Sequence, residues 1–278
     1  MPALSEDIGD HAVYFRGEKL YGDDFDADRI AKWLEDERDA FVALKGGEHY
    51  PYPDHALNIR YGYRFLPARR FPRVLGLGSA YGDELEPILP RVESITIVEP
   101  SDHYVRGQIH GVPATYVEPR VDGTLPFPDG HFDLATCFGV LHHLPNVSRV
   151  VRELYRCLAP GGYLLVHEPI ISMGDWRNPR PGTTKRERGI PLPIFRDILS
   201  TAGFHVVSEK RCCSSVMSKL STLINRPVYH STPLVILDEV LCSLLPRHTK
   251  YHPTSLVEKL MVMKVFYVLQ KGSGEGSG

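Results

Sequence analysis

Three histidines stand where the sequence could carry out acid–base chemistry. His142 and His143 are neighbours just after a short apolar run, and His167 ends another such run. An imidazole titrates near neutral pH, so a histidine placed against a hydroxyl can take its proton and raise the rate by about 10²–10⁴-fold. We take these three as candidate catalytic bases, with packing or backbone contacts as the alternative for each. No set of His, Asp and Glu has the spacing typical of a metal site, so we predict no metal.

A glycine-rich turn follows the first apolar run of the central part of the chain. Gly76 and Gly78 leave room for a ligand to approach the backbone at the carboxyl end of a strand, where open α/β sheets bind ligands. A dinucleotide site would need its third glycine at Tyr81, and Asp83 and Glu84 would repel a pyrophosphate. Acids at the start of a helix also complement its dipole. The turn nevertheless favours a cationic ligand.

Five stretches, in this order, resemble the motifs of class I S-adenosylmethionine-dependent methyltransferases of the type 11 kind. They are Val74–Asp83, Ile95–Pro100, Asp122–Asp133, Phe138–Pro145 and Leu158–Val166. The similarity covers roughly residues 71–169 and 190–210, and five ordered motifs are far more specific than one. The resemblance implies S-adenosylmethionine, which carries a sulfonium and an ammonium, as the cofactor.

The resemblance also implies which residues bind that cofactor. Glu99 would bind the ribose hydroxyls, and Asp122 would lie on the adenine side with help from the Gly123 backbone. The family usually has an acid where this chain has Gly76, and Asp83 or a water network would replace that acid. The full set of implied cofactor residues is Gly76, Gly78, Ser79, Ala80, Tyr81, Asp83, Glu99, Pro100, Asp122, Gly123, Phe138 and Gly139.

Short apolar runs alternate with amphipathic segments, which is typical of βα units and a mostly parallel sheet. The predicted strands are Arg73–Gly78, Ser94–Glu99, Thr115–Val117, Phe132–Phe138, Tyr163–His167, Phe204–Lys210 and Lys264–Lys271. The predicted helices between them are Gly82–Leu89, Val147–Leu158 and Pro193–Ala202, with a further helix over Asp26–Leu44. The predicted fold is a Rossmann-like, doubly wound α/β domain with a mostly parallel seven-stranded sheet. By resemblance, its last strand is an antiparallel edge strand.

The predicted domain organisation has a core and several additions. Residues 1–70 form an N-terminal cap and residues 71–271 the methyltransferase domain, which contains an acceptor loop at 171–190 and a helical insert at 214–263. Residues 272–278 are a Gly/Ser-rich flexible tail or cloning scar. The apolar residues of the insert form core and lid packing, with a homodimer face or contact with a lipid-linked acceptor as alternatives.

Two basic stretches bear on the substrate. Trp176 and the arginines and lysine of Arg177–Arg188 suit an anionic acceptor such as a phosphate, a carboxylate or a sugar nucleotide, unless the loop is merely solvated. Basic and aromatic residues interleave over Arg60–Arg73, which is also a pattern of RNA stacking. The chain has 278 residues and a formal net charge of −2, which argues against nucleic acid as the main partner.

Other whole-chain features favour a cytoplasmic enzyme. The N-terminus lacks the pattern of a signal peptide, no apolar run is long enough for a transmembrane segment, and five scattered cysteines suit a reducing compartment. We expect methyl transfer to an oxygen of a small-molecule, natural-product or sugar acceptor. The sugar is suggested by a weak resemblance to bacterial methyltransferases that act on surface glycans. The alternatives are an RNA or protein methyltransferase and a non-enzymatic S-adenosylmethionine-binding protein.

Overall fold

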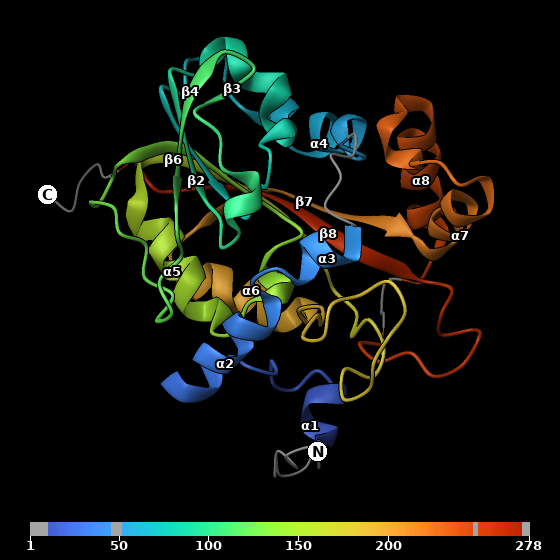
Figure 1. The fold of residues 1–278 in the computed structure, drawn as a ribbon. Helices are drawn as coiled ribbons and strands as arrows, with labels where there is room; N and C mark the ends of the chain where they lie inside the picture. Colours follow the sequence, from blue (N-terminus) through green and yellow to red (C-terminus); the bar gives the residue numbers. More distant parts are fainter. Residues whose placement is uncertain (1–10, 46–51, 247–249, 274–278) are drawn as a thin grey trace, which may run out of the picture.

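The computed structural model describes residues 11–45, 52–246 and 250–273, which form one mixed sheet with helices on both faces (Figure 1). Its strands are β1 (Arg73–Leu77), β2 (Ser94–Val98), β3 (Gln108–Ile109), β4 (Val112–Val117), β5 (Phe132–Phe138), β6 (Leu158–Pro169), β7 (His205–Ser214) and β8 (Val262–Gln270). They lie in the order β3-β4-β2-β1-β5-β6-β8-β7. The five central strands from β4 to β6 pair in parallel, whereas β3, β7 and β8 pair antiparallel with their neighbours. The end of the predicted tail, residues 274–278, lies outside the described residues.

The sheet differs from the predicted one in its number of strands and in its edge. β3 is an eighth strand of only two residues, too short to give a periodic pattern. β8 is not the edge strand, because Val268 pairs with Leu165 of β6 on one side and Ser208 of β7 on the other. The run from Val265 to Leu269 is wholly buried, as expected of a strand with neighbours on both sides and both faces covered.

Helices cover the two faces of the sheet. The α-helices are α1 (Ala12–Phe15), α2 (Ala27–Glu37), α3 (Ala40–Lys45), α4 (His55–Tyr61), α5 (Val147–Cys157), α6 (Leu192–Thr201), α7 (Ser215–Ile224) and α8 (Thr232–Leu244). The 3₁₀ segments are η1 (Tyr63–Phe65), η2 (Asp83–Arg91), η3 (Asp102–Tyr104), η4 (Leu141–His143) and η5 (Val228–His230). One core cluster joins the sheet to α5 and α6, and a second joins it to α4, η2 and α8. No helix in the described part of the chain is long and apolar enough to cross a membrane.

Two of the predicted helices take a different form. The segment after the glycine turn is the 3₁₀ helix η2, because Pro87 and Pro90 lack the N–H groups that an α-helix needs. The predicted helix over Asp26–Leu44 is divided into α2 and α3, and α2 begins at an Asp26 side chain that accepts a hydrogen bond from the Arg29 N–H. Pro87, Pro90 and Asp26 are residues of the kinds that interrupt or begin helices, and they were visible in the sequence.

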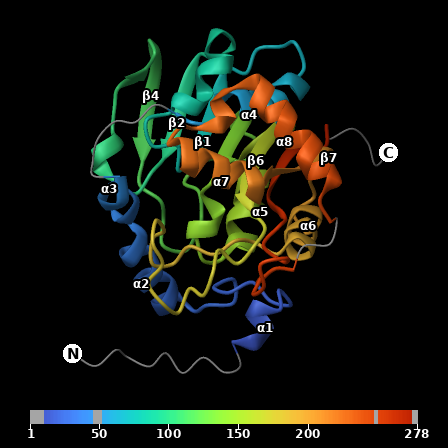
Figure 2. The same ribbon diagram turned by 90° about the vertical axis from the view of Figure 1, so that its right-hand side faces the viewer.

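An aromatic cluster attaches the N-terminal segment to the domain. Tyr14, Tyr21, Trp33, Trp176 and Tyr251 bury their rings together, and they come from three parts of the chain. Both ribbon views place α1 and α2 beside the yellow segment that leads into α6 (Figures 1 and 2). The Trp33 indole N–H also donates to the backbone carbonyl of His143. The cap is therefore held directly against the segment that carries the two adjacent histidines.

Candidate active site and cofactor pocket

A cavity of about 240 Å³ lies at the carboxyl ends of β1, β2 and β5. Glycine-turn residues form one wall, and residues from α2 and its C-terminal flank form another. The predicted site residues that line the cavity are Gly78, Ser79, Ala80, Tyr81, Asp83, Glu99, Pro100, Phe138, Gly139 and His143. The structure therefore brings the glycine turn, the strand-ending acid and one histidine to a single space.

Other predicted site residues do not line this cavity. Gly76 lies within β1, and Gly123 occupies a left-handed turn with φ of +76°. Asp122 is largely exposed and accepts hydrogen bonds from the backbone and hydroxyl of Thr124. These bonds lower the pKa of the Asp122 carboxyl. The neighbouring Val121 lines the cavity.

The glycine turn explains why an acid is absent from Gly76. A Cβ atom on Gly76 would overlap the Ser79 hydroxyl and lie 2.8 Å from the Ser79 Cβ. Ser79 therefore fills the space that any side chain at position 76 would enter. Gly78 is constrained in another way, since its φ is +61° and a Cβ there would lie 2.6 Å from a methyl group of Val140.

Glu99 lies at the end of β2 with its carboxylate bound to the turn. One oxygen accepts from the Ala80 N–H at 3.2 Å and the other from the Ser101 N–H at 3.3 Å. Burial raises the pKa of the Glu99 carboxyl to about 7, and the two backbone N–H groups oppose that rise. A carboxylate that lines the cavity in this way can accept hydrogen bonds from a ligand diol, which is the role that the resemblance implies for Glu99.

Glu84 is a second buried carboxyl in the cavity, and it was not among the predicted site residues. Only 4% of its surface is exposed, and burial raises its pKa to about 7 while the nearby Ser79 and Thr136 hydroxyls oppose the rise. It forms no ion pair with another described residue, whereas Asp83 lies 3.5 Å from the ring of His110. Thr136 pairs in register with Gly76, so Glu84 lies next to Gly76, the position where the family usually has an acid. The two adjacent acids were visible in the sequence, and both line the cavity, but the deeper burial of Glu84 was not predictable from the sequence.

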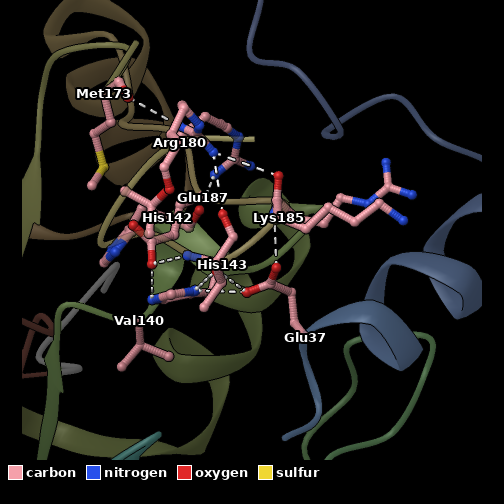
Figure 3. Close-up of polar contacts among 12 residues, drawn as sticks. Glu37, Val140, His142, His143, Met173, Arg180, Lys185 and Glu187 are labelled. Atoms are coloured by element: carbon pink, nitrogen blue, oxygen red, sulfur yellow. Dashed lines mark hydrogen bonds and ion pairs between the residues drawn. The ribbon is translucent and has the colours of Figure 1, made fainter. Parts of the chain in front are cut away.

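His143 lines the cavity, and residues from two other segments hold its ring (Figure 3). Its Nδ1 is 2.8 Å from Oε2 of Glu37, which also accepts a 2.6 Å hydrogen bond from the Thr184 hydroxyl. Its Nε2 is 3.8 Å from Oε1 of Glu187. An ionised Glu37 selects the tautomer with a proton on Nδ1, which leaves the Nε2 lone pair free to accept a proton.

His142 has a different environment from its neighbour. Its Nδ1 is 2.7 Å from Oε2 of the buried Glu168, and the other oxygen of Glu168 accepts from the backbone N–H groups of Val140 and Leu141. Burial lowers the pKa of the His142 imidazole, and the neighbouring His143 lowers it further, although Glu168 opposes both. His142 and Glu168 thus fix the shape of η4.

His167, like His142, does not line the cavity. It is buried within the interior strand β6. Its ring stacks on Phe266 at 5.5 Å, and its Nε2 is 3.7 Å from the Cys213 sulfur. Burial lowers the pKa of His167 well below its usual value, with the Lys264 charge acting in the same direction. The imidazole of His167 is therefore not placed to act on a ligand in the cavity.

The cations of the predicted acceptor loop make contacts within the protein. Arg177 pairs with Asp175, and both Lys185 and Arg186 pair with Asp36 of α2. Arg180 donates to the backbone carbonyl of Met173. Each basic group therefore already has an internal partner. The partner acids of Lys185 and Arg186 lie in a distant segment, so the sequence did not reveal the pairing.

Arg188 is the most deeply buried member of this loop. Its guanidinium donates to the backbone carbonyls of Tyr21, Leu141, His142 and Leu144. The same residue thus connects the N-terminal cap to the histidine-bearing η4. It is fully buried and has no access to a substrate.

Two groups of side chains bring potential metal-ligand atoms within 4.8 Å of one another. They are His142, His143 and Glu187, and His167, Cys212 and Cys213. In the first group both histidines already bind carboxylates through Nδ1, and Glu187 accepts from the Thr184 N–H. In the second group burial raises the pKa of Cys212 well above its usual value, which disfavours the thiolate that binds metal.

Comparison with known proteins identifies the central segment. Residues 75–166 match the family model described as a methyltransferase domain. A probable S-adenosylmethionine-dependent methyltransferase of Mycolicibacterium smegmatis is 31% identical over 139 residues, covering 47% of this chain and 50% of the relative. A ubiquinone/menaquinone biosynthesis C-methyltransferase, UbiE, of Psychromonas ingrahamii is 30% identical over 36% of this chain and 43% of that protein. The chain thus spans about half the length of the curated relatives it matches.

Solved structures show the same fold at low sequence identity. A phosphoethanolamine N-methyltransferase 2 of Haemonchus contortus, in complex with S-adenosyl-L-methionine, has a TM-score of 0.54 and 13% identity over 87% of this chain and 60% of that one. The cyclase SpnF has a TM-score of 0.53 and 16% identity over 89% of this chain and 97% of that one. The family match, the order of the motifs and the fold agree. Residues 75–166 thus match a methyltransferase domain, and this match and the named relatives support S-adenosylmethionine as the cofactor.

Proposed function

We propose that this protein transfers a methyl group from S-adenosylmethionine to a small, largely apolar acceptor that carries an ionisable hydroxyl. The observation that carries the proposal is that Glu99, just after β2, and His143, in η4 after β5, line the same cavity. S-adenosylmethionine, when bound, supplies an electrophilic methyl group on a sulfonium. The chain has to bind the two polar ends of the cofactor, orient the acceptor and take its proton.

The two buried carboxyls divide the work of cofactor binding. Glu99 accepts hydrogen bonds from the ribose hydroxyls, and Glu84 binds the ammonium of the methionine part. Glu84 suits a cation because it is buried, lines the cavity and has no ion-pair partner among the described residues. A cation beside a buried carboxylate replaces the solvation lost on burial and lowers the carboxyl pKa. Glu84 takes this role in preference to Asp83, whose carboxylate lies beside His110.

His143 is the base in this proposal, and Glu37 positions it. The acceptor hydroxyl gives its proton to Nε2 of His143 as its oxygen bonds to the methyl carbon, and the carbon–sulfur bond breaks with its electron pair on sulfur. The resulting imidazolium is stabilised by Glu37 at 2.8 Å and by Glu187 at 3.8 Å. His142 holds the loop in place and does not exchange a proton with the acceptor.

The lining of the cavity favours an apolar small molecule over a sugar. Besides the polar residues already named, Arg38 and Tyr52 line the cavity, and the rest of its walls are formed by Leu34, Val42, Leu77, Val98, Tyr104, Pro119, Val121, Phe138, Val140 and Leu144. A sugar would need a polar partner for nearly every hydroxyl. An aromatic hydroxyl has fewer polar atoms to satisfy. It is also more acidic than a sugar hydroxyl, so an imidazole can take its proton more readily.

The methylated atom is an oxygen in this proposal, and an adjacent ring carbon is the second candidate. A phenolate is nucleophilic at both positions. Relatives of both kinds are known by name, since one is a ubiquinone/menaquinone biosynthesis C-methyltransferase and another a ubiquinone biosynthesis O-methyltransferase from Xylella fastidiosa, 27% identical over 50% of this chain. The base chemistry of His143 serves either outcome.

Two measurements test the proposal. Calorimetry should show S-adenosylmethionine binding to the purified chain, and no binding at high micromolar ligand would overturn the assignment. A panel of phenols, quinols and simple sugars should then be incubated with the cofactor and screened for the mass of one added methylene. Product NMR distinguishes a methoxy group from a ring methyl group. Methylation of sugars, with none of phenols or quinols, would refute the proposed acceptor class.

A further inference from the structure

The helices between β7 and β8 expose an unusual amount of apolar surface. On α7, Val216 and Leu223 lie seven residues apart on one stripe, and on α8, Leu237, Val240 and Leu244 form another. Leu223 and Leu256 are each 83% exposed, well beyond what a scattered surface leucine requires. The α7–α8 face is the set Val216, Leu223, Ile224, Ile236, Leu237, Val240, Leu244, Leu256, Val257 and Leu260, all exposed.

These residues lie at one end of the molecule. The two orange helices are side by side in both views and face the reader in Figure 2. Hydrogen bonds between Ser215 and Met261 in both directions place the end of the 255–261 segment against the start of α7. Val216 at the start of α7 and Leu260 near the end of the 255–261 segment, both exposed, therefore lie close to this contact.

Cations without acidic partners accompany the α7–α8 face. Lys219, Arg226 and Lys259 are exposed and form no ion pair with a described residue. The acids of the same region are all engaged. Asp238 is buried and accepts from two backbone N–H groups, Glu239 pairs with Arg60, and Glu258 pairs with Lys250. The face thus combines protruding apolar side chains with uncompensated positive charge.

We propose that the α7–α8 face docks on the surface of a membrane rich in anionic phospholipids. Protruding leucines insert among the acyl chains near the headgroups, while Lys219, Arg226 and Lys259 meet the lipid phosphates. The helices are too short to span a bilayer and lie on its surface instead. A second copy of the chain fits this face less well, because a two-fold contact would bring together two copies of the same positively charged surface.

Vesicle binding by the full chain tests the proposal. The protein is mixed with sedimentable vesicles of phosphatidylcholine alone, or of phosphatidylcholine with phosphatidylglycerol, and the bound fraction is measured by centrifugation. Binding is expected with phosphatidylglycerol and should weaken with added salt. The triple variant Leu223→Ser, Leu244→Ser, Leu256→Ser should bind at least about tenfold more weakly, because each leucine loses its buried methylenes. Lys219→Gln should cost about fivefold.

Matched controls separate docking from damage to the fold. Val105→Ser and Lys19→Gln change an exposed valine and an exposed lysine away from this face and should bind vesicles as the unaltered chain does. S-adenosylmethionine affinity, measured by calorimetry, should be unchanged in every variant, so that failure of docking is distinct from failure of the proposed function. Absent binding to phosphatidylglycerol vesicles would overturn the proposal, and so would equal binding by the triple variant. A dimer that the triple variant dissolves, without vesicle binding, would instead assign the face to self-association.

Discussion

The Nδ1 atom of His143 lies 2.8 Å from Oε2 of Glu37, although the two residues are 106 positions apart in the chain. Glu37 ends α2 of the cap, and His143 ends η4 of the methyltransferase domain. Thr184, from a third segment, donates to the same carboxylate oxygen. The proposed base and its proposed positioning group are thus brought together only when α2, η4 and the segment that carries Thr184 are all in place.

His143→Ala is expected to lower kcat by about 10²–10⁴-fold, because the acceptor then has no base at hydrogen-bond range. Glu37→Gln should cause a smaller loss, because the imidazole stays but loses its fixed tautomer and the charge that stabilises its protonated form. Both losses should shrink as the pH approaches the acceptor's own pKa. Cofactor affinity, measured by calorimetry, is the control and should be unchanged. A variant that retains full kcat across the pH range would rule out His143 as the base.

Glu84→Gln and Glu99→Gln should be distinguishable with two ligands. S-adenosylhomocysteine has both the ammonium and the ribose, whereas 5′-methylthioadenosine has the ribose alone. Glu99→Gln should weaken both ligands, while Glu84→Gln should weaken only S-adenosylhomocysteine, by about tenfold or more for a lost charged contact. Equal weakening of both ligands by Glu84→Gln would show that this residue supports the pocket and does not bind the ammonium.

Cofactor affinity should rise with pH between 6 and 8. Burial raises the pKa values of Glu84 and Glu99 to about 7 in the ligand-free chain, above the ordinary 4.5. Both are largely protonated at pH 6, and the ligand must then displace those protons, so affinity should be at least about tenfold weaker than at pH 8. The Glu99→Gln variant should show a shallower dependence, and an affinity independent of pH in the unaltered chain would contradict the assignment.

The same raised pKa values bear on the stability of the ligand-free chain. The folded state holds these protons more tightly than the unfolded state does. The free energy of unfolding should therefore fall as the pH rises from about 4.5 to 7. Saturating S-adenosylmethionine should offset the fall, as thermal denaturation at several pH values would reveal. Glu84→Gln should reduce the pH dependence without ligand, whereas an unchanged slope would place the titrating group elsewhere.

Arg188→Leu is expected to destabilise the fold by about 3–5 kcal/mol, because four backbone carbonyls lose a buried charged donor. Arg177→Leu removes an exposed arginine that pairs with Asp175 and should cost about 1 kcal/mol or less. Urea denaturation of the two variants makes the comparison. Similar costs for both would contradict the role given to Arg188.

Gly76→Ala should destabilise the chain by about 1–3 kcal/mol, since the new methyl group overlaps Ser79. Adding Ser79→Gly to this variant should recover most of the loss, because the two side chains compete for one space. Chemical denaturation of both single variants and the double variant measures the coupling. Additive effects would show that Ser79 does not occupy the space beside Gly76.

Local sequence signals predicted much of the core, and long-range pairings accounted for what they missed. The turn at Gly78 and the acid at Glu99 belong to contiguous motifs, so their meeting in one cavity followed from strand order. The interior position of β8 depends on pairing with two strands distant in sequence, which an apolar run alone does not specify. The fate of Lys185 was equally hidden, because its partner Asp36 lies 149 positions away. Glu84 and Asp83 are adjacent acids that both line the cavity, and packing determines that Glu84 is buried while Asp83 lies beside His110.

β7 and β8 are antiparallel neighbours, and antiparallel strands need no more than a short turn to join them. Here the connection instead carries α7, η5 and α8, at the end of the strands where Ser214 pairs with Val262. Chain added at that point alters neither the register of the sheet nor the glycine turn several strands away. The connection is therefore a point at which chain can be added without disturbing the pairing of β7 with β8, provided that α8 keeps its packing in the second core cluster.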